Sequence, residues 1–308
     1  MRRLLIDTDT GSDDAVALVM ALRHPDVSVA AITVVAGNVP LEQAVQNALY
    51  TVELCGEAVP VYSGAARPLT RTLETAQFVH GDDGMGDIGL PLSGRVPAEG
   101  YAVDRMIEVI RSNYGEITLV TLGPLTNVAQ AILKDPTIVA KISRCVIMGG
   151  TGSGPGNVTP ASEFNLWVDP EAAKIVFESG LPITLVGWDI SCRRAVFDKE
   201  TAAGIRRIGT ELAHFTIDIQ GKVDDFARRV TKLEGFDLPD PIAMAVAIDP
   251  EMAETRHLHV EVVTHDGVVR GQSVIDWLGL GGGEPNVHVV TDASREKFLA
   301  MLHASLAD

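Results

Sequence analysis

Four carboxylates lie within eight residues near the start of the chain, at Asp7, Asp9, Asp13 and Asp14. They follow a short apolar run typical of a buried strand and precede a second run that predicts a helix. Carboxylates this close repel one another, so either their pKa values rise or a cation lies among them. Oxygen ligands favour a hard cation, Ca²⁺ or Mg²⁺. The alternative is a capped helix with solvated acids, which explains Asp7 and Asp9 poorly.

A later acid, Asp240, is a candidate additional ligand of the same cation. It stands between Pro239 and Pro241, which restrict the backbone on both sides. The competing interpretation is that Asp240 is the N-cap of a helix that begins at Pro241.

A second group of polar residues suits the hydroxyl groups of a sugar. Asn157, Glu163 and Asn165 offer amide and carboxylate groups in and after the glycine-rich stretch 149–160. Each could instead cap a loop. His80 lies in a loop rich in glycine and aspartate, and could be an ordinary surface histidine.

Alternating strands and helices through the first two thirds of the chain predict how these residues are positioned. The pattern indicates an α/β fold with an open, mostly parallel central sheet, helices on both faces and a Rossmann-like arrangement. Because no linker, repeat or charge block divides the chain, we expect residues 1–308 to form a single domain. The strands are expected at 4–6, 27–35, 59–62, 117–122, 143–148 and 182–186.

The remaining segments are less regular. We expect a long loop over 63–100 and late strands over 258–264 and 287–291, as an antiparallel edge or a small appended layer. Helices are expected near 15–22, 41–52, 103–113, 126–133, 170–180, 198–230 with a break at Gly209, 241–249 and 295–306.

The polar residues follow the predicted strands at their carboxyl ends. Asp9, Asn38, Thr126 and Met148 come after four different strands. In open α/β sheets ligands bind beyond these ends, so we expect the four loops to meet at one pocket.

Composition restricts the partners. The 308 residues carry 41 acidic and 25 basic side chains, a net charge of −16, so the protein should repel nucleic acid and anionic membranes. A neutral or cationic substrate is expected. The three cysteines lie far apart, which suits the cytoplasm. The run after Arg2-Arg3 is too short for a signal peptide, and no apolar run approaches the ~20 residues of a membrane span.

Other chemistries match less well. The order Asp7-x-Asp9 is similar to that of haloacid dehalogenase-type phosphatases, but Gly11 stands where they have Thr or Val. An EF-hand fails because Leu18 takes the place of its final Glu. No phosphate-binding or nucleophile-elbow motif is present.

The acidic stretch Asp7-Thr8-Asp9-Thr10-Gly11-Ser12-Asp13-Asp14-Ala15 resembles the signature of the nucleoside hydrolases. This resemblance covers nearly the whole chain. Further matching motifs lie at 37–38, 80–87, 123–127, 148–150, 156–160, 163–165, 169–172, 240–241 and 270–272.

The resemblance implies Ca²⁺-dependent hydrolysis of the N-glycosidic bond of ribonucleosides to ribose and free base, by a homodimer or homotetramer. It implies that Ca²⁺ is held by Asp9, Asp14, the Thr126 backbone carbonyl and Asp240, with Asp7 close by. Asp9 would be the base that deprotonates water. The ribose would be held by Asp13, Asn38, Asn165 and Asp240 at the 2′- and 3′-hydroxyls, by Asn157 and Glu163 at the 5′-hydroxyl, and by Met148.

One position departs from the family pattern. Many members have a histidine immediately before the late metal-binding aspartate, and it protonates the leaving base; here that residue is Pro239. His80 is then the candidate acid. The alternatives are a hydrolase of another N-riboside, a non-catalytic nucleoside- or ribose-binding protein on the same scaffold, and a phosphatase.

Overall fold

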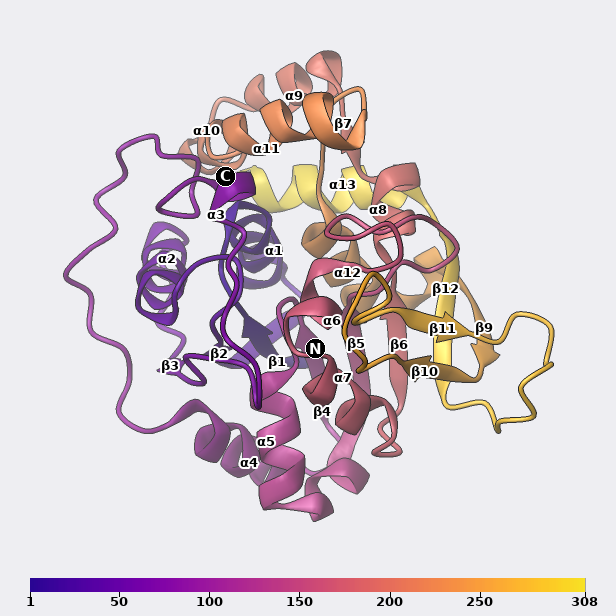
Figure 1. The fold of residues 1–308 in the computed structure, drawn as a ribbon. Coiled ribbons are helices and arrows are strands. Elements are labelled where there is room, and N and C mark those ends of the chain that lie inside the picture. Colours follow the sequence, from indigo (N-terminus) through magenta and orange to yellow (C-terminus); the bar gives the residue numbers. More distant parts are fainter. Residues whose placement is uncertain (308) are drawn as a thin grey trace.

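A single eight-stranded sheet organises the computed structural model, which describes residues 1–307 (Figure 1). Its strand order is β3-β2-β1-β4-β5-β6-β12-β9. All neighbouring strands are parallel except β9, which pairs antiparallel with β12, so the predicted mostly parallel sheet is confirmed. The strands are β1 (Arg2–Thr8), β2 (Val27–Val34), β3 (Val61–Ser63), β4 (Ile117–Thr121), β5 (Ile142–Met148), β6 (Ile183–Val186), β9 (Ala253–Leu258) and β12 (Val287–Ala293).

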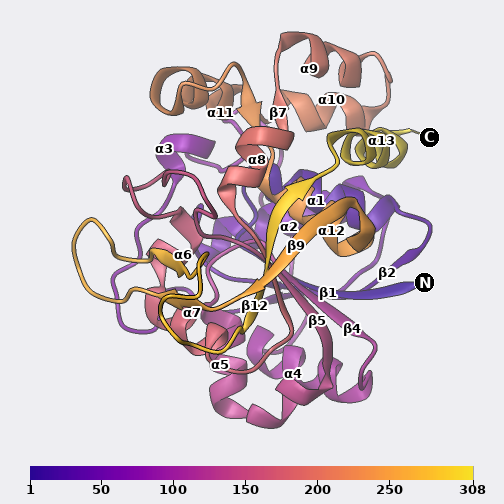
Figure 2. The ribbon, with the colours of Figure 1, turned by 90° about the vertical axis from the view of Figure 1, so that its right-hand side faces the viewer.

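Helices cover both faces of this sheet, as predicted (Figure 2). Each face has its own apolar cluster, one packed under α1, α2, α12 and α13 and the other under α4, α5 and α7. None of the helices within residues 1–307 is long and apolar enough to cross a membrane. These helices are α1 (Ser12–Arg23), α2 (Leu41–Leu54), α4 (Ala102–Ser112), α5 (Thr126–Lys134), α7 (Pro170–Phe177), α12 (Pro239–Ile248) and α13 (Arg295–Leu306).

A third group of short elements follows β6, and most of it lies above α1 and α13 at the top of Figure 1. The predicted break at Gly209 is present, and the residue has a φ of 83°, which suits glycine. The group consists of α8 (Trp188–Arg194), β7 (Val196–Phe197), α9 (Lys199–Arg206), α10 (Glu211–Asp218), α11 (Gly221–Phe226), the π-helical turn η2 (Ala227–Thr231) and β8 (Phe236–Asp237).

The late strands differ from the prediction. The segment expected as one strand over 258–264 is split at His259 between β9 and β10 (Val260–Val262). β10 pairs with β11 (Ser273–Ile275) as a separate hairpin, whereas β12 joins the main sheet parallel to β6. An antiparallel edge and an appended layer are therefore both present.

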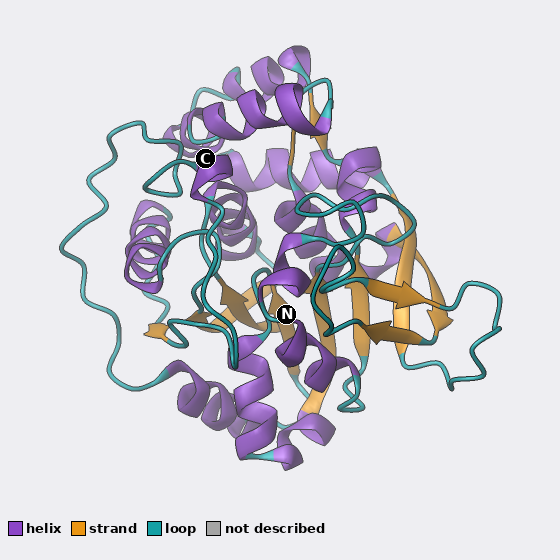
Figure 3. Cartoon of the chain, viewed as in Figure 1, coloured by secondary structure: helices purple, strands orange, loops and turns teal. Residues whose placement is uncertain are grey.

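Loops occupy much of the rest (Figure 3). The long segment between β3 and α4 contains one short helix, α3 (Gln77–His80). Another short helix, α6 (Phe164–Val168), forms where a loop was expected, because Glu163 caps its first turn. Two 3₁₀ turns, η1 (Pro136–Lys141) and η3 (Pro250–Met252), complete the chain.

Asn127, in the first turn of α5, ties together three segments at the carboxyl ends of the strands. Its Nδ2 donates to Asp7 Oδ1 at 2.8 Å and to the Val34 carbonyl at 3.1 Å. Its Oδ1 accepts from the Ala65 amide at 2.9 Å. All four residues are buried; the Ala65 amide has Asn127 as its partner, whereas Asp7 Oδ1 also accepts from the Thr33 hydroxyl.

Asn127→Ala should therefore lower the free energy of unfolding by roughly 2–4 kcal/mol, because it leaves buried polar groups without partners. Denaturant titration followed by circular dichroism measures this change. Gln130→Ala, on the same helix but only partly buried, is the control and should change stability by less than ~0.5 kcal/mol. Equal effects of the two substitutions would contradict the role of Asn127.

Candidate active site

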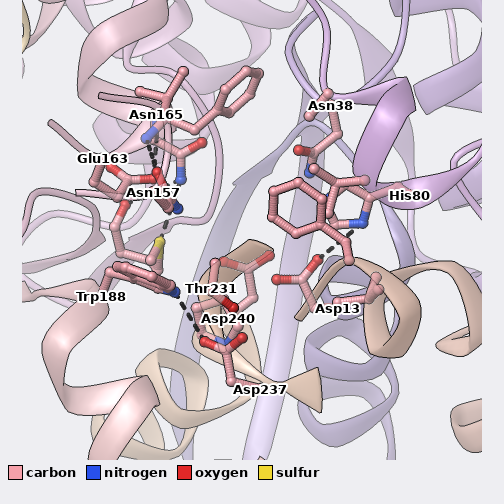
Figure 4. Close-up of a pocket in the computed structure, with 18 of the residues that line it drawn as sticks. Asp13, Asn38, His80, Asn157, Glu163, Asn165, Trp188, Thr231, Asp237 and Asp240 are labelled. Atoms are coloured by element: carbon pink, nitrogen blue, oxygen red, sulfur yellow. Dashed lines mark hydrogen bonds and ion pairs between the residues drawn. The ribbon is translucent and has the colours of Figure 1, made fainter. Parts of the chain in front are cut away.

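A cavity lies at the carboxyl ends of the strands and gathers most of the predicted site residues (Figure 4). Two sets of side chains stand on opposite sides of the view, with Asp240 between them. The predicted residues that line the cavity are Asp13, Asn38, His80, Met148, Asn157, Glu163, Asn165 and Asp240.

Asp13, from the acidic stretch, and Asp240 bring their carboxylates to this cavity, and Asp14 lies close to both. Asp13, Asp14 and Asp240 each place a carboxylate oxygen within 4.8 Å of the others. Burial, followed by the charges of neighbouring aspartates, raises the pKa values of Asp13 and Asp240 well above their usual range. The predicted clustering of acids from the two ends of the chain is therefore present.

Asp9 lies directly beneath, fully buried. Its Oδ2 accepts a hydrogen bond from the backbone amide of Asn38 at 2.6 Å. Burial, and then the charge of Asp14, raises the pKa of Asp9 well above its usual range. The carboxylate fits between two glycines, since a Cβ on Gly37 would lie 2.1 Å from Oδ2 and one on Gly123 would lie 2.5 Å from Oδ1.

Asp14 is held by the turn that begins α1. Its Oδ1 accepts from the Thr8 hydroxyl at 2.6 Å, and its Oδ2 accepts from the Gly11 amide at 2.9 Å. Asn38 Nδ2 also donates to this Oδ2, at 3.0 Å. These contacts fix the carboxylate of Asp14 in the middle of the acidic cluster.

A cation is compatible with this group of residues. Among the described residues, Asp7 Oδ2, Asp9 Oδ1 and Asp13 Oδ1 are buried oxygens without a hydrogen-bond partner. Burying such oxygens unpaired is costly, and a hard divalent cation would satisfy several of them at once. The donor set contains oxygen alone, which suits Ca²⁺ or Mg²⁺ better than a transition metal.

Of the five predicted metal ligands only Asp240 lines the cavity; Asp9 and Asp14 are buried close to Asp240, and Asp7 and Thr126 have other contacts. Asp7 does not line the cavity; its Oδ1 accepts from Thr33 and Asn127, and burial raises its pKa to about 7. Thr126 also lies outside the cavity lining, and its hydroxyl donates to Asp169 at 2.7 Å. The residue of this loop that lines the cavity is Leu122, which directly follows β4 and precedes Thr126 by four positions.

The opposite wall carries the residues expected to bind a sugar. Glu163 accepts from the amides of Gly150 and Asn165, and Asn157 Oδ1 accepts from the Phe164 amide at 2.9 Å. The capping interpretation is therefore correct for both, and both also line the cavity. Burial raises the pKa of Glu163 to about 7.

Asn165 is positioned by contacts with two strand ends. Its Nδ2 donates to the Leu122 carbonyl at 2.7 Å and lies 3.4 Å from both the carbonyl and the sulfur of Met148. The amide oxygen of Asn165 is left to face the cavity that the residue lines.

His80 is a buried cavity residue rather than a surface histidine. Its Nδ1 lies 3.0 Å from the Ser12 hydroxyl and 3.8 Å from Asp13 Oδ1. Burial lowers the pKa of His80 to about 4. The imidazole is thus neutral near pH 7 in the metal-free protein.

Asp240 is not a helix cap. Helix α12 begins at Pro239 and its N-cap is Leu238, so Asp240 lies inside the first turn with its side chain in the cavity. The prolines on both sides allow this because the first turn of a helix needs no backbone donors.

Several cavity residues were missed by the sequence analysis. Trp188 follows β6 at its carboxyl end, so the rule that located the other loops could have found it. Asp237 and the apolar residues of α11 gave no comparable signal, since they lie in a separate group of short elements. The apolar part of the lining includes Phe78, Val79, Val223, Phe226 and Ala227.

Comparison with known proteins agrees with this geometry. The sequence profile described as "Inosine-uridine preferring nucleoside hydrolase" matches residues 4–300. The chain belongs to this family. Its members named below are ribonucleoside hydrolases, which are N-glycosyl hydrolases, so the predicted family and enzyme class are confirmed.

Three relatives with different names are between 32% and 38% identical to this chain. The pyrimidine-specific ribonucleoside hydrolase RihA of Salmonella agona (strain SL483) is 38% identical over 305 residues, covering 97% of this chain and 96% of that protein. The structure of the plant nucleoside hydrolase PpNRh1 has a TM-score of 0.92 at 34% identity, covering 99% of each chain. The purine-preferring ribonucleoside hydrolase from Gardnerella vaginalis has a TM-score of 0.91 at 32% identity, covering 99% and 98%.

The close approach of Gly37 to Asp9 yields a test. A Cβ in Gly37→Ala would overlap Asp9 Oδ2 and displace the carboxylate. We expect kcat/KM for ribonucleoside hydrolysis to fall by about 10²-fold, the effect of a small misplacement of a reacting group. Gly204→Ala, where the nearest atom would be Arg207 Nη2 at 3.6 Å, is the control. Full activity in Gly37→Ala would contradict the tight fit.

Proposed function

We propose that the protein is a Ca²⁺-dependent ribonucleoside hydrolase of the cytoplasm and acts as a homodimer or homotetramer. The observation that carries the catalytic part is the buried carboxylate cluster beside a wall of amide and carboxylate groups, in one cavity. A neutral nucleoside suits such a cavity, whereas a phosphorylated nucleotide would be repelled by the acids.

The cation would be held by Asp9, Asp14 and Asp240; Asp14 and Asp240 belong to the carboxylate cluster, and the charge of Asp9 acts on Asp240. In place of Thr126 we assign the remaining protein ligand to the Leu122 carbonyl, because Leu122 lines the cavity. Bound there, Ca²⁺ would lower the pKa of a water molecule and orient it and the ribose hydroxyls.

Asp9 is assigned the role of general base. Its Oδ1 has no hydrogen-bond partner among the described residues and can accept the proton that the attacking water loses. The Asn38 amide holds the other oxygen, so the carboxylate cannot rotate away.

The other polar residues would hold the ribose. Asp13, Asn38, Asn165 and Asp240 are assigned to the 2′- and 3′-hydroxyls, Asn157 and Glu163 to the 5′-hydroxyl, and Met148 to the ring. As the bond to the base breaks, positive charge develops on the ribose. The surrounding carboxylates stabilise this charge electrostatically.

His80 is assigned to activation of the leaving base. With Ser12 beside Nδ1, the proton of the neutral imidazole can lie on Nε2. A neutral imidazole N–H stabilises developing negative charge by hydrogen bonding, without full ionisation of the ring. Pro239, in the position of the usual histidine, has no proton to donate.

The metal assignment predicts one Ca²⁺ per chain and loss of turnover after chelation. Elemental analysis of the purified protein and ribose release before and after chelation test this. Restoration by added Ca²⁺ is the control for irreversible damage. Full activity in protein shown to contain no metal would exclude the assignment.

The division of roles predicts unequal effects of two isosteric substitutions. Asp9→Asn removes the base and should lower kcat by about 10²–10⁴-fold. Glu163→Gln touches only the 5′-end and should cost much less in kcat, though not nothing, because remote binding energy is used in the transition state. Steady-state kinetics with inosine and uridine decide; equal losses would reverse the assignment.

The assignment of His80 predicts a dependence on the leaving group. His80→Ala should slow natural nucleosides by up to about 10²–10⁴-fold. It should barely affect p-nitrophenyl riboside, whose leaving group departs as a stable anion. The ratio of kcat/KM for uridine to that for p-nitrophenyl riboside is measured in both proteins, and an unchanged ratio would remove His80 from the mechanism.

A further inference from the structure

The cavity has an apolar part that is distinct from its sugar-binding walls. Phe78 on α3 and Phe226 on α11 contact each other edge to face, with ring centroids 5.8 Å apart, and Val79 and Val223 also line this part. Flat apolar and aromatic surfaces suit the faces of a nucleobase. On the proposed function, this part of the cavity receives the base.

Asp237 is a carboxylate at the border of this apolar part. It ends β8, which packs against α11 and η2, the elements that supply the apolar lining. Asp237 and Pro239 are separated by a single residue, Leu238, and both line the cavity. A carboxylate thus lies two residues from the position where many relatives carry their histidine.

One oxygen of Asp237 is fully engaged and the other is free. Oδ2 accepts from Trp188 Nε1 at 2.9 Å and from the Ser191 hydroxyl at 2.6 Å, and Figure 4 shows the indole directed at the carboxylate. Within residues 1–307, Oδ1 receives no hydrogen bond and is not among the enclosed unpartnered oxygens. Oδ1 therefore faces the cavity that Asp237 lines.

The two donors define what Oδ1 can do. Burial raises the pKa of Asp237 above its usual value, and the hydrogen bonds from Ser191 and Trp188 offset only part of this rise. The geometry of these two donors, both on Oδ2, is therefore what leaves Oδ1 available as an acceptor in the ionised form. An ionised carboxylate can only accept hydrogen bonds. Because both donors converge on Oδ2, Oδ1 is held as a fixed acceptor at the edge of the apolar part.

We propose that Asp237 is a specificity-determining residue, which accepts a hydrogen bond from an N–H group of the nucleobase. This inference rests on the proposed function. It favours bases that present an N–H group, such as uracil at N3 or hypoxanthine at N1, over analogues that lack it. Such a buried acceptor discriminates because it stays unpaired when the N–H is missing.

The substitution Asp237→Asn tests this directly. The amide oxygen can still accept from Trp188 and Ser191, which leaves the NH₂ group in the place of Oδ1. The cavity-facing acceptor thus becomes a donor without a change in shape. Asp292→Asn, which removes a carboxylate paired with Arg194 outside the cavity, is the matched control.

The substrates are two pairs in which the second member lacks the N–H group together with the adjacent exocyclic carbonyl: uridine with pyrimidin-2-one riboside, and inosine with purine riboside. For each pair, the ratio of kcat/KM is compared between proteins, so that intrinsic differences between leaving groups cancel. We expect at least one ratio to fall by at least about tenfold in Asp237→Asn and to stay constant in Asp292→Asn. Ratios unchanged in Asp237→Asn for both pairs would overturn the inference.

Dissociation constants for the same pairs, measured by calorimetry in the Asp9→Asn background, separate the inference about Asp237 from the proposed hydrolase function. Discrimination in binding without any turnover by the wild-type protein would contradict the proposed function alone. If Asp237→Asn does not fold, Trp188→Phe removes the indole N–H that orients the carboxylate and should reduce the ratios partially. No change in Trp188→Phe would then overturn the inference.

Discussion

The burial of several carboxylates at one place is the constraint on which this structure depends. Asp9 and Asp14 are fully enclosed, and Asp13 and Asp240 are nearly so. Placing like charges in a low-dielectric interior is unfavourable unless each receives donors or a cation. The parallel sheet brings the loops after several strands to the same place. These loops supply backbone amides and polar side chains that donate hydrogen bonds to the carboxylates.

The support of the acids extends well beyond their own loop. Asn38 contacts both Asp9 and Asp14, and Asn127 holds Asp7 while it joins β1, β2 and α5. The glycines at 37 and 123 leave the space that the Asp9 carboxylate occupies. The same residues therefore contribute to the stability of the fold and to the placement of the buried aspartates. Substitutions here should change both the free energy of unfolding and the activity.

The sequence was sufficient for the sheet, for most helices and for many polar residues that line the cavity. Asn38 and Met148 lie at the ends of parallel strands, so the rule that ligands bind at the carboxyl ends locates them, whereas Asn157, Glu163 and Asn165 were found by their polar side chains in and after a glycine-rich stretch. Leu122 shows the limit of that reasoning, because this apolar residue lines the cavity directly after β4 and no polar side chain marks it in the sequence. The π turn η2 and the short β8 could not be predicted, since no periodic pattern marks them and tertiary packing decides their form.

The two parts of the cavity are built by different means, and this bears on how specificity can vary. Much of the polar part follows β1, β2 and β5, which cannot shift without disturbing the core, although His80 comes from α3 and Asp240 from α12. The apolar part is formed by α3, α11, η2 and β8, short elements joined by loops. Their residues can change with little effect on the sheet. Relatives named for pyrimidine and for purine nucleosides are 38% and 32% identical to this chain, each over nearly its whole length. That similarity is expected if the shared sheet determines the ribose chemistry while the short elements, with Trp188 and Asp237, determine the base.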